Sequence, residues 1–211
     1  MRQTSISFQS KGLSLEGIVA VPDTGSSFPG VVLCHGHTIF GGGMDSPLFM
    51  EITKELTKQG YACLRFNFRG VGNSGGKFSN GETEHHDVIA ALKVIAAWPG
   101  VNRSRLALIG HSFGASTILM SLKSMRLASA LVLLSPTLSS VRRAKLSKEK
   151  RSALFIAGGE DRIVPIDRLQ EEIHAAHLTQ QLQIVVGADH IYGDKELEVA
   201  VKIADYFVEV L

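Results

Sequence analysis

Short, uninterrupted runs of apolar residues constrain the fold of this chain more than any other feature. These runs are separated by stretches that are mostly long enough for a helix, and they occupy residues 31–34, 62–68, 106–109, 130–134, 153–157 and 183–186. A strand without alternation is buried on both faces, which requires helices on each side of a parallel sheet. Residues 13–21 alternate instead, as expected of a half-buried strand at an antiparallel edge of the sheet.

The segments between the apolar runs predict five helices. They are expected at residues 47–59, 82–97, 113–123, 166–176 and 195–210. Ser46-Pro47 is a typical helix start, and Gly60 a typical stop. A chain of 211 residues with 45% hydrophobic residues suits one domain with a sizeable core. We therefore predict a single α/β domain over residues 1–211, built on a mostly parallel sheet with helices on both faces.

The overall charge argues against nucleic acid or an anionic membrane as the main partner. Lys and Arg number 22 against 20 Asp and Glu, so no strong long-range field is expected. Cys34 and Cys63 lie in apolar runs and are expected to be buried thiols in a reducing compartment. The N-terminal residues lack the apolar core of a signal peptide, and no apolar run has the length of a membrane span. We expect a cytoplasmic protein that binds a small molecule; the sequence leaves its oligomeric state open, a homodimer included.

One stretch is strongly basic. Residues 142–151 oppose a lone Glu149 with six cationic residues: Arg142, Arg143, Lys145, Lys148, Lys150 and Arg151. Such runs usually form a solvated surface connection, which is the interpretation we favour. Recognition of an anionic substrate is the alternative.

The motif Gly110-His111-Ser112-Phe113-Gly114 joins an apolar run to a predicted helix. A serine nucleophile must stand clear of the backbone on a very tight turn, so its neighbours two residues away cannot carry bulky side chains. The motif therefore predicts Ser112 as a nucleophile at the carboxyl edge of the sheet, where α/β folds place their ligands.

Two further residues needed for acyl transfer come after Ser112 along the chain. Asp161, in Gly-Gly-Glu-Asp, comes directly after a buried run, where a carboxylate can orient a histidine ring. Glu160 is the adjacent alternative, and a helix cap is the non-catalytic interpretation of Asp161. Of the eight histidines, His190 is the one expected in a loop beyond a strand downstream of Asp161. The order Ser, Asp, His is that of one particular hydrolase fold.

Backbone amides must also bind the oxyanion that forms during acyl transfer. We expect one from Phe113, which follows the nucleophile, and one from His37 in the glycine-rich loop 35–43. His35 and His37 could instead bind a metal, but no carboxylate or thiolate at recognisable spacing accompanies them. We predict no metal site.

Three other patterns are weaker indications of function. Residues 70–75 fit G-x-G-x-x-G, but a loop rather than a helix comes next, which argues against a dinucleotide site. His85-His86-Asp87 imitates a metal cluster, although adjacent helical residues point in different directions. His174 and His177 lie on a predicted helix and are expected to be exposed or packed.

Together, these motifs resemble the α/β-hydrolase superfamily. The likeness rests on HGHTIFGGGMD, RFNFRGVGNSGG, GHSFG, GGEDRIVP and ADH, covers nearly the whole chain, and is nearest to small esterase-like and dienelactone-hydrolase-like bacterial members. The resemblance implies a triad of Ser112, Asp161 and His190, with oxyanion amides from His37 and Phe113 and no cofactor. Dienelactone hydrolases carry a cysteine at the nucleophile position, so the serine here favours ordinary ester hydrolysis.

Relatives often insert a helical cap between the two strands expected at 130–134 and 153–157, where this chain is too short for one. We therefore expect an open site. The side chains expected to line it are Ile39, Phe40, Phe113, Thr137, Leu138, Ile163, Ile191 and Tyr192. The predicted activity is hydrolysis of small esters with short or compact acyl groups, through an acyl-enzyme on Ser112. The alternatives are thioester or peptide cleavage by the same residues, or a ligand-binding protein without activity.

Overall fold

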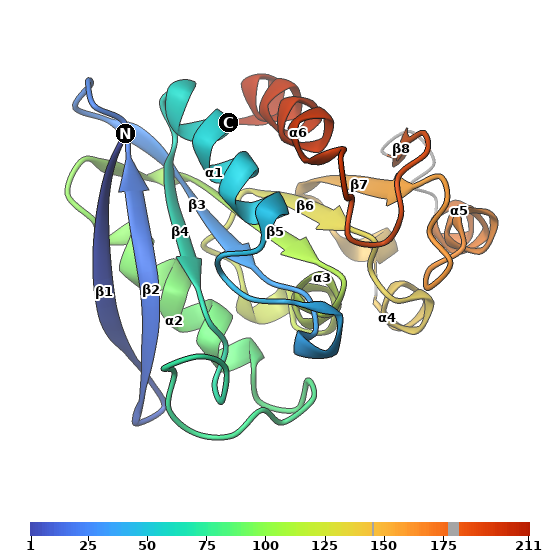
Figure 1. Cartoon of the computed structure of the whole chain (residues 1–211), viewed down its shortest axis with the longest axis horizontal. Helices are drawn as coiled ribbons and strands as arrows, with labels where there is room; N and C mark the ends of the chain where they lie inside the picture. The colour runs from blue at the N-terminus through green and yellow to red at the C-terminus, as the bar shows by residue number, and fades with distance from the viewer. Residues whose placement is uncertain (145, 177–181) are drawn as a thin grey trace.

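The central element of the fold is an eight-stranded sheet with the order β1-β2-β4-β3-β5-β6-β7-β8 (Figure 1). The computed structural model describes residues 1–144, 146–176 and 182–211, so Lys145 and His177 lie outside the described residues. The strands are β1 (Arg2–Ser10), β2 (Leu13–Val21), β3 (Phe28–Cys34), β4 (Ala62–Phe66), β5 (Val101–His111), β6 (Ala130–Leu134), β7 (Ser152–Gly158) and β8 (Leu182–Val185). Strands β3 to β8 are parallel where they pair, which confirms the predicted class.

The antiparallel edge of the sheet differs from the prediction. Strand β2 is antiparallel to β4, but β1 pairs along its other side and forms the true edge. Lys11 and Gly12, both with positive φ (49° and 82°), make the tight turn between β1 and β2. Residues 1–10 look polar because β1 is largely exposed and turns only a few side chains, such as Phe8, toward the core. The sequence prediction therefore missed this strand.

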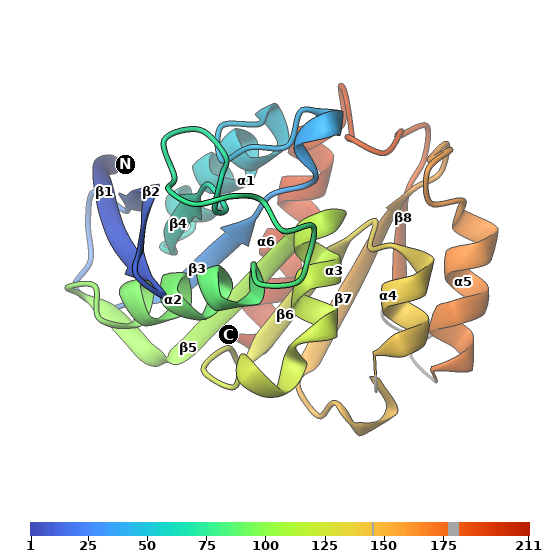
Figure 2. The ribbon, with the colours of Figure 1, turned by 90° about the horizontal axis from the view of Figure 1, so that it is seen from below.

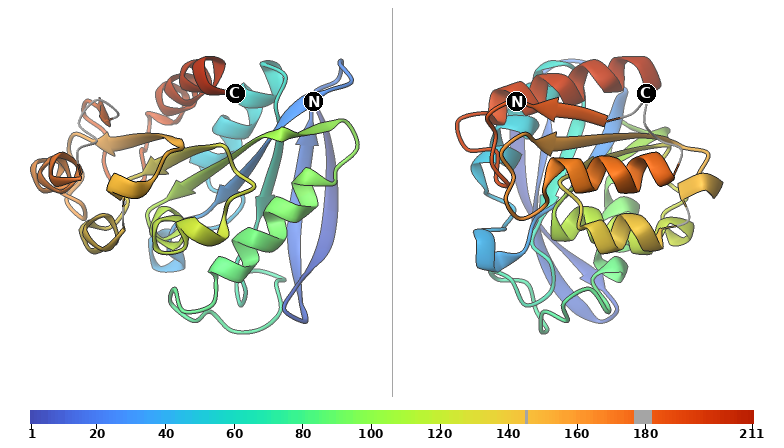
Figure 3. Two further views of the ribbon diagram at one scale, coloured as in Figure 1. Left: turned by 180° about the vertical axis from the view of Figure 1, so that it is seen from behind. Right: turned by 90° about the vertical axis from the view of Figure 1, so that its right-hand side faces the viewer.

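Helices cover both faces of the sheet. They are α1 (Pro47–Lys58), α2 (His85–Ala96), α3 (Phe113–Met120), α4 (Leu138–Arg143), α5 (Ile166–Ala175) and α6 (Glu196–Val210), with 3-10 turns η1 (Thr38–Phe40), η2 (Leu122–Ser124) and η3 (Leu146–Lys148). Figure 2 shows α2, α3, α4 and α5 in front of the sheet, with α1 and α6 behind it. Figure 3 shows the same three layers from behind and from the side. All five predicted helices are present, with ends shifted by up to three residues.

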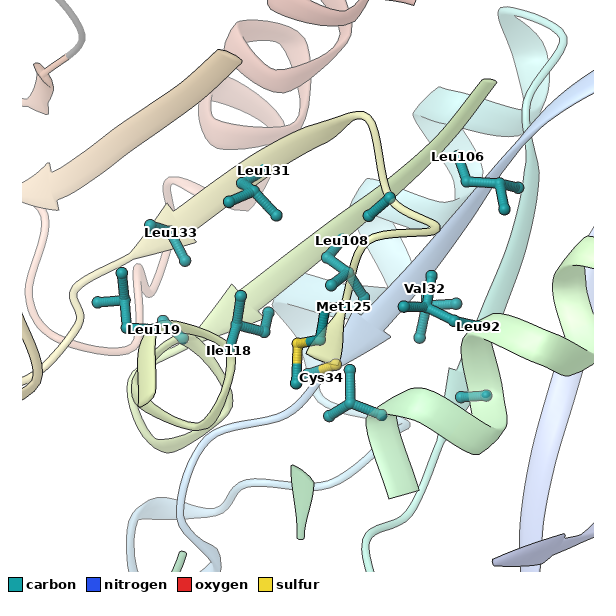
Figure 4. Packing of buried hydrophobic residues seen from close by; sticks show 14 of the residues in the cluster. Val32, Cys34, Leu92, Leu106, Leu108, Ile118, Leu119, Met125, Leu131 and Leu133 are labelled. Carbon is teal, nitrogen blue, oxygen red and sulfur yellow. The ribbon is translucent and has the colours of Figure 1, made fainter. Parts of the chain in front are cut away.

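The uninterrupted apolar runs are explained by two cores, one on each face. In β3, Val32 and Cys34 point into the core under α2 and α3, whereas Val31 and Leu33 point into the core under α1 and α6. Figure 4 shows the first of these cores, where side chains of β3, β5 and β6 meet those of α2 and α3. A fully buried side chain of this kind contributes roughly 1.5–3 kcal/mol, so consecutive positions of a strand that is covered on both faces, such as residues 31–34 of β3, are all apolar.

The connection between β6 and β7 is short and carries no cap domain in its described residues. These residues form only α4, a helix that the sequence did not predict, and η3; the sequence had predicted a connection too short for a cap. Its basic run is not entirely solvated, however, because the guanidinium of the half-buried Arg151 donates to the carbonyl oxygens of Met125 (2.7 Å) and Leu122 (3.0 Å). Within the described part of the chain, no helix combines the length and apolarity needed to cross a membrane.

Candidate active site

Ser112 lies on a strained turn between β5 and α3. Its backbone has φ 50° and ψ −105°, a conformation that costs a non-glycine residue roughly 1–3 kcal/mol. A Cβ atom at Gly110 would lie 2.5 Å from the amide nitrogen of Ala115, and one at Gly114 would lie 1.9 Å from the carbonyl oxygen of Cys34. Both positions therefore require glycine, for the reason that the motif predicted.

A continuous chain of hydrogen bonds joins Ser112 to Asp161 through His190. Nε2 of His190 lies 2.8 Å from Oγ of Ser112, and Nδ1 lies 2.8 Å from Oδ2 of Asp161. The other carboxylate oxygen accepts the backbone N–H groups of Ile163 (2.9 Å) and Val164 (2.8 Å). The three side chains come after β5, β7 and β8 at the carboxyl edge of the sheet, as the sequence predicted.

Asp161 is the carboxylate that carries these contacts, and Glu160 is exposed beside it. Burial by itself would raise the pKa of Asp161, but hydrogen bonds from His190 and the backbone of Val164 outweigh it and hold the pKa below its usual value. The carboxylate is therefore charged at neutral pH. It keeps a proton on Nδ1 of His190 and leaves Nε2 free to accept one from Ser112.

His111 supports the loop that carries His190, a contact that sequence reasoning missed. Its Nε2 donates to the carbonyl oxygen of His190 (2.8 Å), and the two rings lie 5.4 Å apart. Burial lowers the pKa of His111 to about 4, so the ring is neutral. The motif position before the serine draws attention to His111, but only the folded chain places it against a residue 79 positions further along.

The loop expected to supply an oxyanion amide lies beside Ser112. The rings of His37 and Phe113 meet edge to face, with centroids 5.8 Å apart, and both residues line the same cavity as Ser112. The backbone N–H groups of these two residues donate to no other group in the described part of the chain. They are therefore available to a substrate oxygen.

Both ring nitrogens of His35 form hydrogen bonds with the backbone. Its Nδ1 donates to the carbonyl oxygen of Gly36 (2.7 Å), and its Nε2 accepts the N–H of Phe68 (3.1 Å). Burial lowers the pKa of His35 to about 4. Residues 1–144, 146–176 and 182–211 contain no group of three or more His, Cys, Asp or Glu side chains arranged to hold a metal ion.

Two cavities flank Ser112. The larger, of about 600 Å³, is lined by five of the predicted residues: Ile39, Phe40, Phe113, Thr137 and Ile163. It is also lined by Arg143, from the basic run for which anionic-substrate recognition was the alternative, and by residues that the sequence did not indicate: Asn80, Gly81, Glu82, Ser116, Thr117, Met120, Ser139 and Ser140. The smaller, of about 200 Å³, shares His37, Phe40 and Ser112 with the first and adds His111, His190, Ile191 and Glu196.

Two of the predicted lining residues were wrong. Tyr192 is fully buried, and its hydroxyl donates to the carbonyl oxygen of Ile156 (2.9 Å) and lies 2.8 Å from Oγ of Ser135. A buried tyrosine needs such partners, and the turn at residue 192 directs the ring into the core under α1 and α6 while Ile191 stays exposed. Leu138 is half-buried and packs against the other core instead of lining the cavity.

The segment before α2 forms part of the cavity wall. The buried carboxylate of Glu84 accepts the N–H groups of Ser79 (2.5 Å) and Gly81 (2.9 Å), which holds residues 80–82 beside the cavity. No periodic pattern marks this segment, so its place could not be predicted from the residues alone. The glycines at 70–75 form turns, and α2 begins only at His85; the G-x-G-x-x-G match therefore does not open a helix, as predicted.

Known proteins resemble this chain over most of its length. An uncharacterized protein of Rickettsia prowazekii is 28% identical over 195 residues, which cover 89% of this chain and 82% of that protein. A solved structure of a protein of unknown function from Agrobacterium tumefaciens is 25% identical with a TM-score of 0.84, covering 98% of this chain and 95% of the other. One from Xanthomonas campestris, described as an α/β serine hydrolase without a lid, is 23% identical with a TM-score of 0.82, covering 99% and 94%.

The family itself is identified by a match over more than half of the chain. The model of the family described as serine aminopeptidase, S33, matches residues 28–154, which include the nucleophile turn and the glycine-rich loop. The sheet order agrees with this match. The chain therefore belongs to the serine aminopeptidase S33 family of α/β serine hydrolases.

Proposed function

We propose that this protein is a carboxylesterase-like serine hydrolase that cleaves small esters through an acyl-enzyme on Ser112. The observation that carries the proposal is the unbroken chain of hydrogen bonds from Asp161 through His190 to Ser112, which ends at two cavities. Each step of the reaction uses a group of the chain itself, so we propose no metal or organic cofactor.

In the first half of the reaction, Oγ of Ser112 attacks the ester carbonyl while Nε2 of His190 takes its proton. Asp161 stabilises the imidazolium that forms. The free N–H groups of His37 and Phe113 receive the negative charge on the carbonyl oxygen. His190 then gives its proton to the leaving alcohol, and the C–O bond breaks.

In the second half, a water molecule takes the place of the alcohol. His190 removes a proton from the water as it attacks the acyl carbon, and the same two amides hold the second oxyanion. Collapse returns the proton from His190 to Ser112 and releases the acid. The net reaction consumes one water and one ester.

The two cavities suggest where the parts of the substrate lie. His190 must protonate the leaving group, and His190 lines the smaller cavity but not the larger one. We therefore place the alcohol in the smaller cavity and the acyl group in the larger one. A cavity of about 600 Å³ is within the usual range for small-molecule sites.

The open wall of the larger cavity favours compact acyl groups. Ile39, Phe40 and Ile163 line it but remain 79%, 49% and 46% exposed among the described residues. A methylene contributes roughly 0.8 kcal/mol to binding only if it leaves water. Long acyl chains should therefore gain little beyond the first few carbons.

A series of p-nitrophenyl esters from acetate to palmitate tests this proposal. We expect kcat/KM to be highest for short or compact acyl groups and to stop rising, or to fall, at chains of about eight carbons or more. No increase in rate is expected when the ester passes its solubility limit, because no lid has to open. A steady gain in kcat/KM up to palmitate, or a sharp increase at the onset of emulsion, would contradict the open site.

The same assay separates the alternatives that use the same residues. Acyl thioesters and amino acid p-nitroanilides are offered to the wild-type protein at matched concentrations. We expect the highest kcat/KM for the oxygen esters. A higher value for either of the other two classes would make the protein a thioesterase or a peptidase, and no turnover in any class would favour a ligand-binding protein.

A further inference from the structure

The larger cavity has a cationic residue at the end away from the leaving group. It shares His37, Phe40 and Ser112 with the smaller cavity, and it shares Met120 and Arg143 with a third cavity of about 400 Å³. Ser112 thus lies at one border of the larger cavity and Arg143 at the other. An acyl group on Ser112 that filled this cavity would come close to Arg143.

Helix α4 presents Arg143 from a fixed base. Val141 is buried in the core, whereas Ser139, Ser140 and Arg143 line the cavity, as residues three and four apart on one helix face do. Oγ of Ser140 donates to the carbonyl oxygen of Thr137 (2.7 Å).

This base is tied directly to the nucleophile turn. Oγ of Ser116 on α3 lies 3.2 Å from Oγ of Ser140 and accepts the backbone N–H of Thr137 (3.1 Å). The same hydroxyl donates to the backbone carbonyl of Ser112 (2.9 Å). The base of Arg143 is therefore fixed relative to the reacting carbonyl.

Arg142 and Arg143 differ in what they bind. Arg142 forms an ion pair with Glu172 on α5. Arg143 is exposed. It makes no ion pair with any described residue. Even Glu82, whose carboxylate also lines the larger cavity, is not paired with it. Its guanidinium remains available to a ligand in the cavity.

The charge beyond Arg143 is also positive. The adjoining cavity is lined by Lys123 and Lys148, with His85 and Glu149. The carboxylate of Glu149 is already bound by the guanidinium of Arg151 at 2.8 Å and 2.6 Å. The neighbouring cations should therefore attract an anion toward Arg143.

We propose that the acyl group of the natural substrate ends in a carboxylate and that Arg143 binds this carboxylate. The inference rests on the proposed esterase function and names the substrate class for the same site: monoesters of dicarboxylic acids. The planar guanidinium matches a carboxylate in two parallel hydrogen bonds. The same charge would repel the free ammonium group of an aminopeptidase substrate.

The test compares two matched ester series. One consists of p-nitrophenyl monoesters of dicarboxylic acids from succinate to suberate, and the other of p-nitrophenyl esters of monocarboxylic acids with the same numbers of carbons. Each rate is corrected for hydrolysis without enzyme. For the wild type, we expect kcat/KM at the best length to be higher for the dicarboxylic monoester than for its neutral match.

Two variants of neighbouring residues then identify the source of this preference. Arg143→Gln should lower the ratio of the two kcat/KM values by about twofold to fivefold, the range expected for an ion pair at an exposed site. Arg143→Lys should retain part of the ratio. Arg142→Gln, the matched control on the same helix, should leave the ratio unchanged, although it loses the ion pair with Glu172.

The outcomes separate the inference from the function on which it rests. A wild type that hydrolyses the neutral esters without preferring the dicarboxylic ones, or an Arg143→Gln variant with the wild-type ratio, would overturn the inference alone. An equal loss of the ratio in Arg142→Gln would assign it to general surface charge and would also overturn the inference. A wild type that hydrolyses neither series would remove the proposed esterase function and this inference with it.

Discussion

Two carboxylates, Asp161 and Asp87, are both buried and both accept several hydrogen bonds, but their hydrogen-bond networks lead to different parts of the molecule. Asp87, at the start of α2, is fully buried and accepts hydrogen bonds from Oγ of Ser10 (2.5 Å) and from the backbone and guanidinium of Arg69. Asp161 is almost as buried and accepts two backbone amides and His190.

The two carboxylates differ in where their hydrogen-bond networks end. The partners of Asp87 connect parts of the scaffold to one another: Ser10 ends β1, and Arg69 lies in the segment after β4. The network stops there, and no cavity adjoins it among those described at Ser112. His190, by contrast, continues to Ser112, which lines two cavities. Burial and pairing of a carboxylate therefore do not by themselves indicate a catalytic role; the group at the far end of the network does.

Removal of the Asp161 charge should have the largest effect on activity. In Asp161→Asn, the amide can hold the wrong tautomer of His190, and kcat should fall by roughly 10⁴-fold. Glu160→Gln is the matched control, because this adjacent residue is exposed; its kcat should stay within a few-fold of the wild type. Steady-state kinetics on a short p-nitrophenyl ester check both variants. A crippled Glu160→Gln beside an active Asp161→Asn would show that the acid is Glu160 instead.

The corresponding change at Asp87 should act on stability instead. Asp87→Asn leaves the buried guanidinium of Arg69 without its charged partner, which should lower the free energy of unfolding by about 3–5 kcal/mol. The kcat per folded molecule should remain near the wild-type value. Urea denaturation followed by circular dichroism measures the first quantity, and active-site titration corrects the second. If Asp87→Asn keeps full stability but loses turnover, the two carboxylates do not differ in the way described.

The pH dependence of stability should report on two buried histidines, His111 against the loop of His190 and His35 against Phe68 beside Arg69. His35 and His111 keep pKa values of about 4 in the fold because burial disfavours their charged forms, against about 6.5 in the unfolded chain. Between these values the unfolded state binds more protons, so the free energy of unfolding should fall as pH is lowered from 6.5 to 4. Each histidine contributes up to about 3 kcal/mol to this loss, and none of the loss occurs above about pH 6.5.

A substitution at His111 tests whether this histidine causes part of the pH dependence of stability. His111→Gln removes one of the two buried rings, so the free energy of unfolding, measured by urea denaturation at several pH values, should depend less steeply on pH than in the wild type. An unchanged slope in this variant would show that His111 is not held neutral by the fold.

The sequence predicted the sheet class, the five long helices and the three residues Ser112, Asp161 and His190 that meet at the carboxyl edge of the sheet, because each rests on a local pattern. Buried strands are marked by uninterrupted apolar runs, and the turn at Ser112 is marked by two glycines that steric crowding requires. Strand β1 was missed because one exposed edge strand needs few apolar residues.

The walls of the cavities were harder to predict than the groups at their base. Tyr192 and Ile191 are neighbours in sequence, yet the positive φ of Tyr192 (60°) sends its ring into the core while Ile191 stays at the cavity. Arg143 lay in a basic run whose members looked alike. Only the folded structure distinguishes them: Arg142 pairs with Glu172, Arg151 donates to backbone carbonyl oxygens, and Arg143 lines the cavity.

Both halves of the proposed reaction depend on Ser112, which attacks the ester and then carries the acyl group, and labelling with a fluorophosphonate probe tests that role most directly. Intact mass spectrometry of the labelled protein, followed by peptide mapping, should show a single adduct on Ser112. Ser112→Ala should remain unlabelled and inactive while its thermal midpoint stays near that of the wild type, because the change removes the nucleophile without opening a core cavity. An adduct on another residue, or no adduct on the folded wild-type protein, would contradict the assignment of Ser112 as the nucleophile.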